Sequence, residues 1–342
     1  TAPSLDCQDI TVQLENDGLA SITPAHIVGT PSEGCGLAST TLDISAFDCA
    51  DVGQNTVVVT AEDENGNTST CTAIVTVEDN IAPVASCQDL TLQLDAGGAV
   101  LLTPAQLDAG SGDACGVTLD FGDDLPSTAE FGCGEVGVQT VPLQVMDANG
   151  NTSTCVSSVT IEDNVAPVAL CQNVTVELDV LGNANLTPAD VNNGSNDACG
   201  LASLTLNSSS FDCTDIGTQT VTLTVEDNNG NTSTCTATVT VEDNTSPSLD
   251  CQDITVQLDN DGLASITPAH IVGTPSEGCG LASTTLDISA FDCADVGLNT
   301  VVVTAEDENG NTSTCTAMVT VEDNIPPVAS CHDLTLQLDA GG

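Results

Sequence analysis

The chain has 342 residues, with no lysine, no arginine and 50 aspartate and glutamate residues, so its formal net charge is −50 at pH 7. This balance excludes nucleic acid as a partner, because phosphate binding needs cationic side chains, and it disfavours an anionic membrane surface. Hydrophobic residues make up 40% of the chain and no run of them reaches transmembrane length, so we expect folded modules without membrane insertion. The acidic groups must stay hydrated or bind cations, and a divalent metal is the natural candidate.

One stretch recurs through the chain with the pattern Val-Thr-(Val/Ile)-Glu-Asp-Asn-x-x-Pro-x-x-x-Cys. Each copy predicts a strand that ends in acidic residues, a short joint and a cysteine that opens the next module. We therefore predict a tandem array of modules, at residues 1–80, 81–164, 165–244 and 245–324, with the start of a fifth, truncated module at 325–342. Residues 245–342 repeat residues 1–98 with only six substitutions, so we expect the full protein to be a much longer array.

Within the first module, short runs of alternating polar and apolar residues predict strands at residues 9–14, 19–22 and 37–44. Thr23-Pro24 combines a capping residue with proline and predicts a single helical turn. The clearest hairpin comes last, around Asn65-Gly66, and Phe47 is expected to plug the core. Many short strands in about 80 residues, with almost no helical periodicity, predict an all-β fold of immunoglobulin-like β-sandwich modules.

Each module carries four cysteines at repeated positions, which in the first module are 7, 35, 49 and 71. This regularity, without a CxxC pair, favours disulfides of an oxidising compartment over zinc. Four cysteines allow three pairings. We predict two disulfides per module, one between the first and last cysteines (the outer pair) and one between the two middle cysteines (the inner pair). The main alternative is a bridge from Cys71 to Cys87 across the joint. The predicted bridges are Cys7–Cys71, Cys35–Cys49, Cys87–Cys155, Cys115–Cys133, Cys171–Cys235, Cys199–Cys213, Cys251–Cys315 and Cys279–Cys293.

The alternation of side chains along the strands predicts that Asp63 and Asp79 point inward. In the last hairpin Asp63 continues the face of Val57 and Val59, and Asp79 continues the face of Val75 and Val77. An inward carboxylate needs a partner, and this chain has no cationic side chain apart from histidine. The two groups are expected at opposite ends of the module, which brings each linker beside the last hairpin of the next module.

We therefore predict Ca²⁺ at each junction, because it takes six to eight oxygen ligands. The candidate ligands are Asp63 and, at successive junctions, Glu78, Asp79, Asn80 with Asp147, Asn149, Asn151; Glu162, Asp163, Asn164 with Asp227, Asn229, Asn231; and Glu242, Asp243, Asn244 with Asp307, Asn309, Asn311. The alternative is that each hairpin segment is simply a good turn whose Asp and Asn cap local amides. Acidic residues two positions before a cysteine form a weaker second candidate site, for which a solvated loop is the favoured interpretation; they are Glu33, Asp113, Asp197 and Glu277. His26 and His270 are expected to be exposed.

The last hairpin and the joint that follows it resemble the sequence pattern of a known module family. Residues 56–71 read TVVVTAEDENGNTSTC and run on to Cys87, and each module resembles a hyalin repeat (HYR), an immunoglobulin-like extracellular module. The Phe-Asp-Cys-x-Asp-x-Gly and Asp-Ala-Cys-Gly variants resemble tandem arrays in giant surface adhesins of gliding Bacteroidetes, exported by the type IX secretion system. The resemblance implies a secreted cell-surface filament or stalk. The joint is also similar to cadherin linkers (Asp-Asn-x-x-Pro), which implies calcium by analogy.

We thus expect a non-enzymatic structural segment of a long, secreted surface adhesin, an extended rod stiffened by disulfides and Ca²⁺ that supports adhesion or gliding motility. Its expected partners are neighbouring modules of the same chain and other copies in a filament or bundle. The alternatives are a self-assembling extracellular filament and an array that binds surface glycan or ice through outward threonines such as Thr56 and Thr60. An enzyme is disfavoured because the same carboxylates recur in every module and no nucleophile–base pair stands out.

Overall fold

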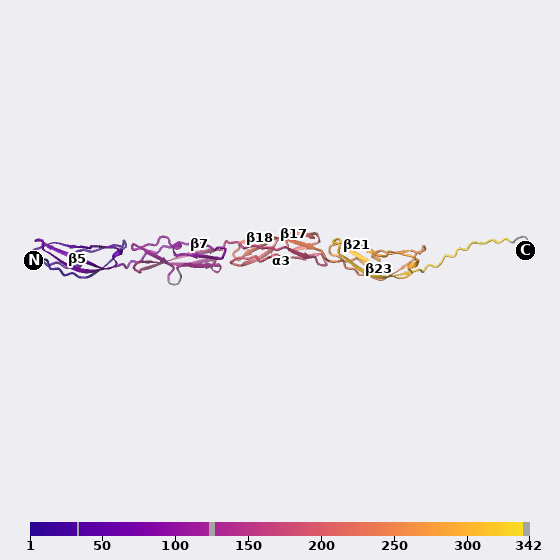
Figure 1. The fold of residues 1–342 in the computed structure, drawn as a ribbon, viewed down its shortest axis with the longest axis horizontal. Coiled ribbons are helices and arrows are strands. Elements are labelled where there is room, and N and C mark those ends of the chain that lie inside the picture. The colour runs from indigo at the N-terminus through magenta and orange to yellow at the C-terminus, as the bar shows by residue number, and fades with distance from the viewer. Residues whose placement is uncertain (33, 123–126, 338–342) are drawn as a thin grey trace. The chain divides into compact units, whose positions relative to one another are not determined.

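The computed structural model describes residues 1–32, 34–122 and 127–337. The chain divides into two compact units, Thr1–Val165 and Ala166–Gly342, and each unit holds two modules built from the same elements (Figure 1). In the first module these elements are β1 (Ile10–Gln13), β2 (Ala20–Ser21), α1 (Pro24–Ile27), β3 (Leu37–Leu42), β4 (Ala46–Phe47), η1 (Cys49–Asp51), β5 (Gly53–Asp63) and β6 (Thr68–Glu78).

The other modules repeat this order. The second has β7 (Leu90–Gln93), β8 (Ala99–Leu102), α2 (Pro104–Leu107), β9 (Val117–Asp120), β10 (Ala129–Gly132), η2 (Cys133–Glu135), β11 (Gly137–Asp147) and β12 (Thr152–Glu162). The third has β13 (Val174–Glu177), β14 (Asn183–Asn185), α3 (Pro188–Val191), β15 (Leu201–Leu206), β16 (Ser210–Asp212), η3 (Cys213–Asp215), β17 (Gly217–Asp227) and β18 (Thr232–Glu242). The fourth has β19 (Ile254–Gln257), β20 (Ala264–Ser265), α4 (Pro268–Ile271), β21 (Leu281–Leu286), β22 (Ala290–Phe291), η4 (Cys293–Asp295), β23 (Gly297–Asp307) and β24 (Thr312–Glu322).

Two sheets form each sandwich. In the first module the larger sheet has the strand order β1-β6-β5-β3, and β2 pairs with β4 in the smaller one. Strand β1 is parallel to β6, whereas β5 is antiparallel to both β6 and β3. The same orders recur in every module, so the predicted all-β array of sandwich modules is confirmed. In residues 325–337, the described part of the predicted fifth module, there is no helix or strand, and the module boundaries stay a prediction.

The long hairpin of β5 and β6 carries the core. Its inward side chains alternate with half-exposed or exposed ones, and Val57, Val59 and Val75 are completely buried. Phe47, on β4 of the other sheet, is buried against this face as predicted. The inward parity extends to the strand ends, because Asp63 is only 1% exposed.

The single helical turn forms at the predicted Thr-Pro pair. Thr23 precedes α1, and its backbone N–H donates a hydrogen bond to Nδ1 of His26 at 3.1 Å. Gln106 and Asp190 accept the equivalent bond with side-chain oxygens. His26 is exposed as expected, and it has a capping role that the sequence interpretation did not assign.

Candidate functional site at the module junctions

One disulfide lies within each module. Its cysteines precede the first strand of the larger sheet and sit in the last strand, so the bridge closes almost the whole module into one loop. The outer pairing forms as predicted, in Cys7–Cys71, Cys87–Cys155, Cys171–Cys235 and Cys251–Cys315. A loop of this size adds about 4 kcal/mol by loop-closure entropy.

The predicted inner pairing is wrong, because the second kind of bridge joins different modules. Cys49 bonds Cys115 of the next module, and Cys213 bonds Cys279 in the same way, with Cα atoms 5.3 Å apart in both. Cys133 is also disulfide-bonded. The pairings that the structure contradicts are Cys35–Cys49, Cys115–Cys133, Cys199–Cys213 and Cys279–Cys293. The rival bridge from Cys71 to Cys87 does not form either, since both cysteines are used within modules.

Strand direction explains the error. Cys35 precedes β3, whose first residue pairs with Asp63 at one end of β5, whereas Cys49 precedes Gly53 at the other end of β5. The eleven residues of β5 span about 36 Å at 3.3 Å per residue. A disulfide needs Cα atoms within about 7 Å, so Cys35 cannot reach Cys49. The strand predicted at residues 37–44 lies between these two cysteines, so it already indicated that they are far apart.

A glycine turn makes room for the inter-module bridge. Gly18, with φ 74°, lies so close to the bridge that a Cβ atom there would come within 2.9 Å of both Cys49 Sγ and Ala114 Cβ. At the equivalent Gly182, with φ 75°, a Cβ atom would lie 2.5 Å from Cys213 Sγ. The sequence predicts these glycines only as turn residues, and their second role depends on a bridge that it did not predict.

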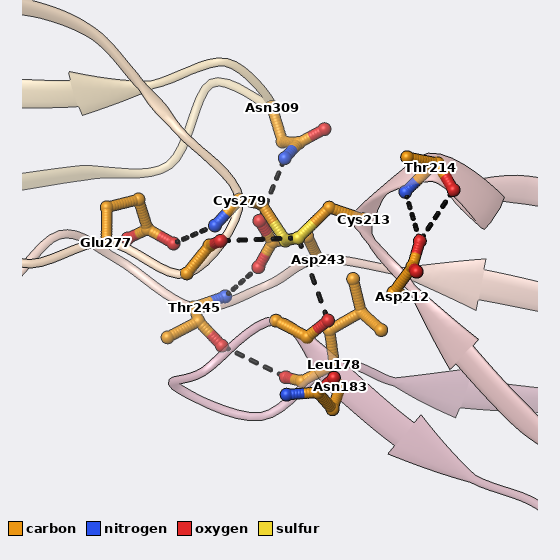
Figure 2. The surroundings of a disulfide bond; sticks show 12 residues. Leu178, Asn183, Asp212, Cys213, Thr214, Asp243, Thr245, Glu277, Cys279 and Asn309 are labelled. Carbon is orange, nitrogen blue, oxygen red and sulfur yellow. Dashed lines mark hydrogen bonds between the residues drawn. A yellow bond between two sulfur atoms is a disulfide. The ribbon is translucent and has the colours of Figure 1, made fainter.

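The linker aspartate is held by amides of the next module. Asp79 is 8% exposed, and its Oδ2 accepts a hydrogen bond of 2.8 Å from Nδ2 of Asn149. Its backbone oxygen accepts a second bond, of 3.0 Å, from Nδ2 of Asn151. Asp243 has the same two bonds from Asn309 and Asn311, at 2.8 and 2.9 Å, and Figure 2 shows the first of these beside the Cys213–Cys279 bridge. The topology argument therefore placed the linker correctly beside the last hairpin of the following module.

The hairpin aspartates are occupied by their own turns. Oδ1 of Asp147 accepts bonds from the backbone N–H groups of Asn149 and Asn151, at 2.8 and 2.9 Å, and Oδ2 accepts one from Nδ2 of Asn151 at 2.8 Å. Asp63, Asp227 and Asp307 have the same three bonds. These turns satisfy both carboxylate oxygens without a cation, as the turn alternative predicts.

These hydrogen bonds also favour the ionised form of the carboxylates. Burial opposes ionisation of Asp147 and Asp227, but the hydrogen bonds from the turn asparagines outweigh it, so the pKa of each carboxyl lies below its ordinary value. The pKa of Asp63 is lowered chiefly by the side-chain bond from Asn67. All three groups therefore carry full negative charge at neutral pH.

The remaining linker residues face their own module. Glu78 Oε2 accepts a 2.7 Å bond from Nε2 of Gln13 on β1, and Asn80 donates a 2.7 Å bond to Oε1 of the same glutamine. Glu162 and Asn164 make the same contacts with Gln93, and Asn244 lies 3.4 Å from carboxylate oxygens of Glu177 and Glu242. The hydrogen bonds of these predicted ligands are thus made within their own modules.

Two or three carboxylates meet at the junctions that lie within a unit. One oxygen each of Asp243, Glu277 and Asp307 lies within 4.8 Å of the others, and the corresponding group around Asp79 contains Asp113 and the sulfur of Cys115. That sulfur is disulfide-bonded, so it is no thiolate ligand. Asp113 and Glu277 therefore belong to the acidic clusters, and whether they form the second predicted metal site or a solvated loop stays a prediction. Glu33 lies outside the described residues.

Asp163, the linker aspartate that follows the second module, is also buried. Asp163 is 6% exposed and its Oδ1 accepts a 3.0 Å bond from the N–H of Val165. Asp227 is 1% exposed and has the turn bonds given above, to Asn229 and Asn231. Both carboxylates are as buried as their equivalents at the other junctions.

The sheets and bridges define a class of extracellular-type tandem β-sandwich modules, since disulfides of this density are typical of an oxidising compartment. Residues 162–241 match the HYR domain. The other three modules repeat its elements, and they repeat its cysteine spacing except for four extra residues between Cys115 and Cys133. Hyalin of Strongylocentrotus purpuratus is 28% identical over 354 residues, which covers 97% of this chain and 29% of hyalin. The chain is therefore a tandem array that is similar to hyalin along nearly its whole length, and it spans less than a third of that relative's length.

Among solved structures, similar chains include extracellular cadherin domains 1–5 of protocadherin gamma B2 (15% identity, TM-score 0.29, 95% of this chain and 82% of that chain). Immunoglobulin domains 1–5 of Sidekick-1 are 12% identical, with a TM-score of 0.35, over 94% of this chain and 81% of theirs. At these scores the likeness carries no argument, and the fold class rests on the sheets themselves. Among the described residues, none of the helices has the length and apolar character needed to cross a membrane.

Proposed function

We propose that the chain is a structural segment of a long, secreted surface adhesin, a stalk whose modules are fixed to their neighbours by covalent crosslinks. The observation that supports this most is the second kind of disulfide, Cys49–Cys115 and Cys213–Cys279. A module that only binds a ligand or catalyses a reaction needs no covalent bond to its neighbour. A stalk does, because its use depends on fixed angles between successive modules.

The junction contacts support the same function. At one junction three segments of the second module are attached: its N-terminal linker, the loop of Cys115 through the disulfide, and the hairpin of Asn149 and Asn151 through the bonds to Asp79. Three attachments oppose both bending and twisting, whereas a single linker opposes neither. In the surface stalk that we propose, the partners are neighbouring modules and other copies of the chain, and gliding motility is one process that such an adhesin would serve.

We further propose that Ca²⁺ binds the acidic clusters, first at Asp243, Glu277 and Asp307. Three carboxylates converge there in a chain without lysine or arginine, and Ca²⁺ accepts such hard oxygen ligands flexibly. Asn309 now donates Nδ2 to Asp243, so binding requires its amide to turn and present Oδ1. The ion would neutralise the cluster and add stiffness to a junction that the disulfide already holds.

Solution scattering on the full chain tests the stalk. Under oxidising conditions without Ca²⁺, we expect a long maximum dimension in the unmodified chain and a shorter, broader distance distribution in the variant Cys49→Ser/Cys115→Ser/Cys213→Ser/Cys279→Ser. Cys293 is exposed and unbonded, so Cys293→Ser is a matched control that should leave the profile unchanged. An equally long and narrow profile in the quadruple variant would remove the support for crosslinked junctions.

Calorimetric titration with Ca²⁺ tests the metal separately. We expect heat of binding whose contribution from this cluster is lost in Asp243→Asn/Glu277→Gln, together with a higher melting temperature in millimolar Ca²⁺. Asp250→Asn changes an acidic residue outside these clusters and serves as the control. Titration without heat and an unchanged melt would refute calcium while leaving the stalk proposal intact.

A further inference from the structure

The in-module bridges leave only a short peptide outside their loops. Cys7 and Cys71 are 64 residues apart, and everything between them is enclosed by the bridge. The next enclosed loop begins at Cys87. The peptide that connects successive loops is therefore residues 72–86 here, and residues 156–170 and 236–250 at the later joints.

This arrangement determines where tension would run. A pull on the chain enters at Cys7, crosses the bridge to Cys71 and follows β6 to Glu78, then continues through the linker to Cys87. Strand β6 is already extended and is hydrogen-bonded to β5 on one side and to β1 on the other. Most of the sandwich therefore lies outside the load-bearing path.

We infer that the chain is a nearly inextensible tether, in which the in-module disulfides shunt tension past each module. The inference rests on the proposed stalk function, because it describes how such a stalk would carry load. At about 3.5 Å per residue, the peptide from Cys71 to Cys87 reaches about 56 Å when fully stretched, and the bridge adds a Cα–Cα distance of 5.9 Å. A module of 80 residues without the bridge would reach about 280 Å.

The length that a bridged module gains on unfolding is correspondingly small. From Cys71 to Glu78, strand β6 already spans about 23 Å in the folded module. Complete unfolding of a bridged module therefore releases no more than about 40 Å, against about 260 Å for an unbridged one. The array keeps its length even when individual sandwiches open.

The inter-module bridges lie off this path. A route through Cys49 and Cys115 would run back from Cys71 to Cys49 and then from Cys115 back to Cys87, which is about three times as long as the linker. While the in-module bridges are intact, Cys49–Cys115 carries load only after the linker is cut. The two kinds of disulfide therefore have separable mechanical roles, which provides a matched control.

Single-molecule force extension of the full oxidised chain, held at its two ends, tests the shunt. We expect releases of no more than about 40 Å per module in the unmodified chain. An intact inter-module bridge would offer a shorter route, so the in-module variant is made without it: Cys7→Ala/Cys71→Ala in the Cys49→Ala/Cys115→Ala background should add one release of about 220 Å, from the 64 residues that the bridge no longer encloses. Cys251→Ala/Cys315→Ala in the Cys213→Ala/Cys279→Ala background should give the same value in the fourth module, and Cys49→Ala/Cys115→Ala alone should add no long release.

Two results would overturn the inference. One is a release near 200 Å in the oxidised, unmodified chain, and the other is an unchanged total length in Cys7→Ala/Cys71→Ala made in that background. If that variant fails to fold its first module, the freed 64 residues appear as slack at low force, so the total length still decides. Scattering tests the stalk at rest, so a flexible chain with short releases would refute the stalk while sustaining the shunt.

Discussion

The two junctions that lie within compact units have the same frame and different acidic clusters. Both have an inter-module disulfide and two amide bonds to the linker aspartate. Where one has Asp113, the other has Glu277, whose extra methylene group lets its carboxylate lie near both Asp243 and Asp307. The covalent and amide contacts are thus constant between the junctions, whereas the number of converging carboxylates differs. Crosslinking is therefore the shared basis of the junction, and one side chain changes how many carboxylates converge there.

The largest effect is expected from cutting a linker. A protease site placed at residues 81–85 allows cleavage between the first two modules, which Cys49–Cys115 still joins. We expect the cut chain to run as one species on a non-reducing gel and to separate in Cys49→Ser/Cys115→Ser. The same site at residues 245–249 should behave identically through Cys213–Cys279. Separation of the cut oxidised chain would show that the crosslink does not form.

Much of this frame could be predicted from the sequence. Alternation gave the last hairpin, and parity gave the buried positions of Asp63 and Asp79, because a side chain's face depends only on its place along a strand. The inner disulfides could not be assigned by spacing, since Cys35 and Cys49 are near in sequence and lie at opposite ends of β5. Glu277 was placed only in a weaker second candidate site, because its approach to Asp243 and Asp307 depends on contacts between modules, which no local pattern encodes.

Removal of an in-module bridge should produce the next largest effect. Cys7→Ala/Cys71→Ala reopens a loop of 64 residues, and we expect the first module to lose about 4 kcal/mol of unfolding free energy. Cys251→Ala/Cys315→Ala opens a loop of the same length in the nearly identical fourth module. Chemical denaturation should give equal losses for both pairs, and a difference above about 1 kcal/mol would show that the junctions contribute unequally to module stability.

Substitution of the junction glycine separates backbone strain from crowding. Gly182→Ala puts a Cβ atom at φ 75° and 2.5 Å from Cys213 Sγ, so we expect a loss of about 3 kcal/mol. Gly230→Ala imposes a positive φ of 91° with no atom within 4 Å, and should lose only about 1 kcal/mol. Denaturation of both variants measures the difference. Equal losses would mean that the turn does not pack against the bridge.

Exchange of one acidic side chain should change the difference between the junctions. Asp113→Glu gives the first junction the longer carboxylate of the second, and we expect its Ca²⁺ affinity to rise on the order of tenfold, about 1.4 kcal/mol. Glu277→Asp should lower affinity at the other junction by a similar factor. Calorimetric titration of both variants measures these shifts. Unchanged affinities would place any bound ion away from these residues.

The smallest effect is expected on the acid side of the stability curve. The pKa of Asp147 is lower in the folded protein than its ordinary value, so its contribution to stability is present above about pH 4 and is lost as the pH falls through the folded pKa. Asp63 has the same turn and a lowered pKa, but its turn binds no linker aspartate among the described residues. Asp147→Asn and Asp63→Asn should therefore both flatten the acid limb of denaturation curves measured from pH 5 downward.

Only one of these substitutions should also loosen a junction. Asn149 and Asn151, which the Asp147 carboxylate orients, donate the bonds that hold Asp79. We therefore expect Asp147→Asn to speed amide hydrogen exchange at residues 79–81 at neutral pH, and Asp63→Asn to leave it unchanged. Equal exchange in both variants would mean that the disulfide alone fixes the linker, and that the amide bonds follow from the crosslink without strengthening it.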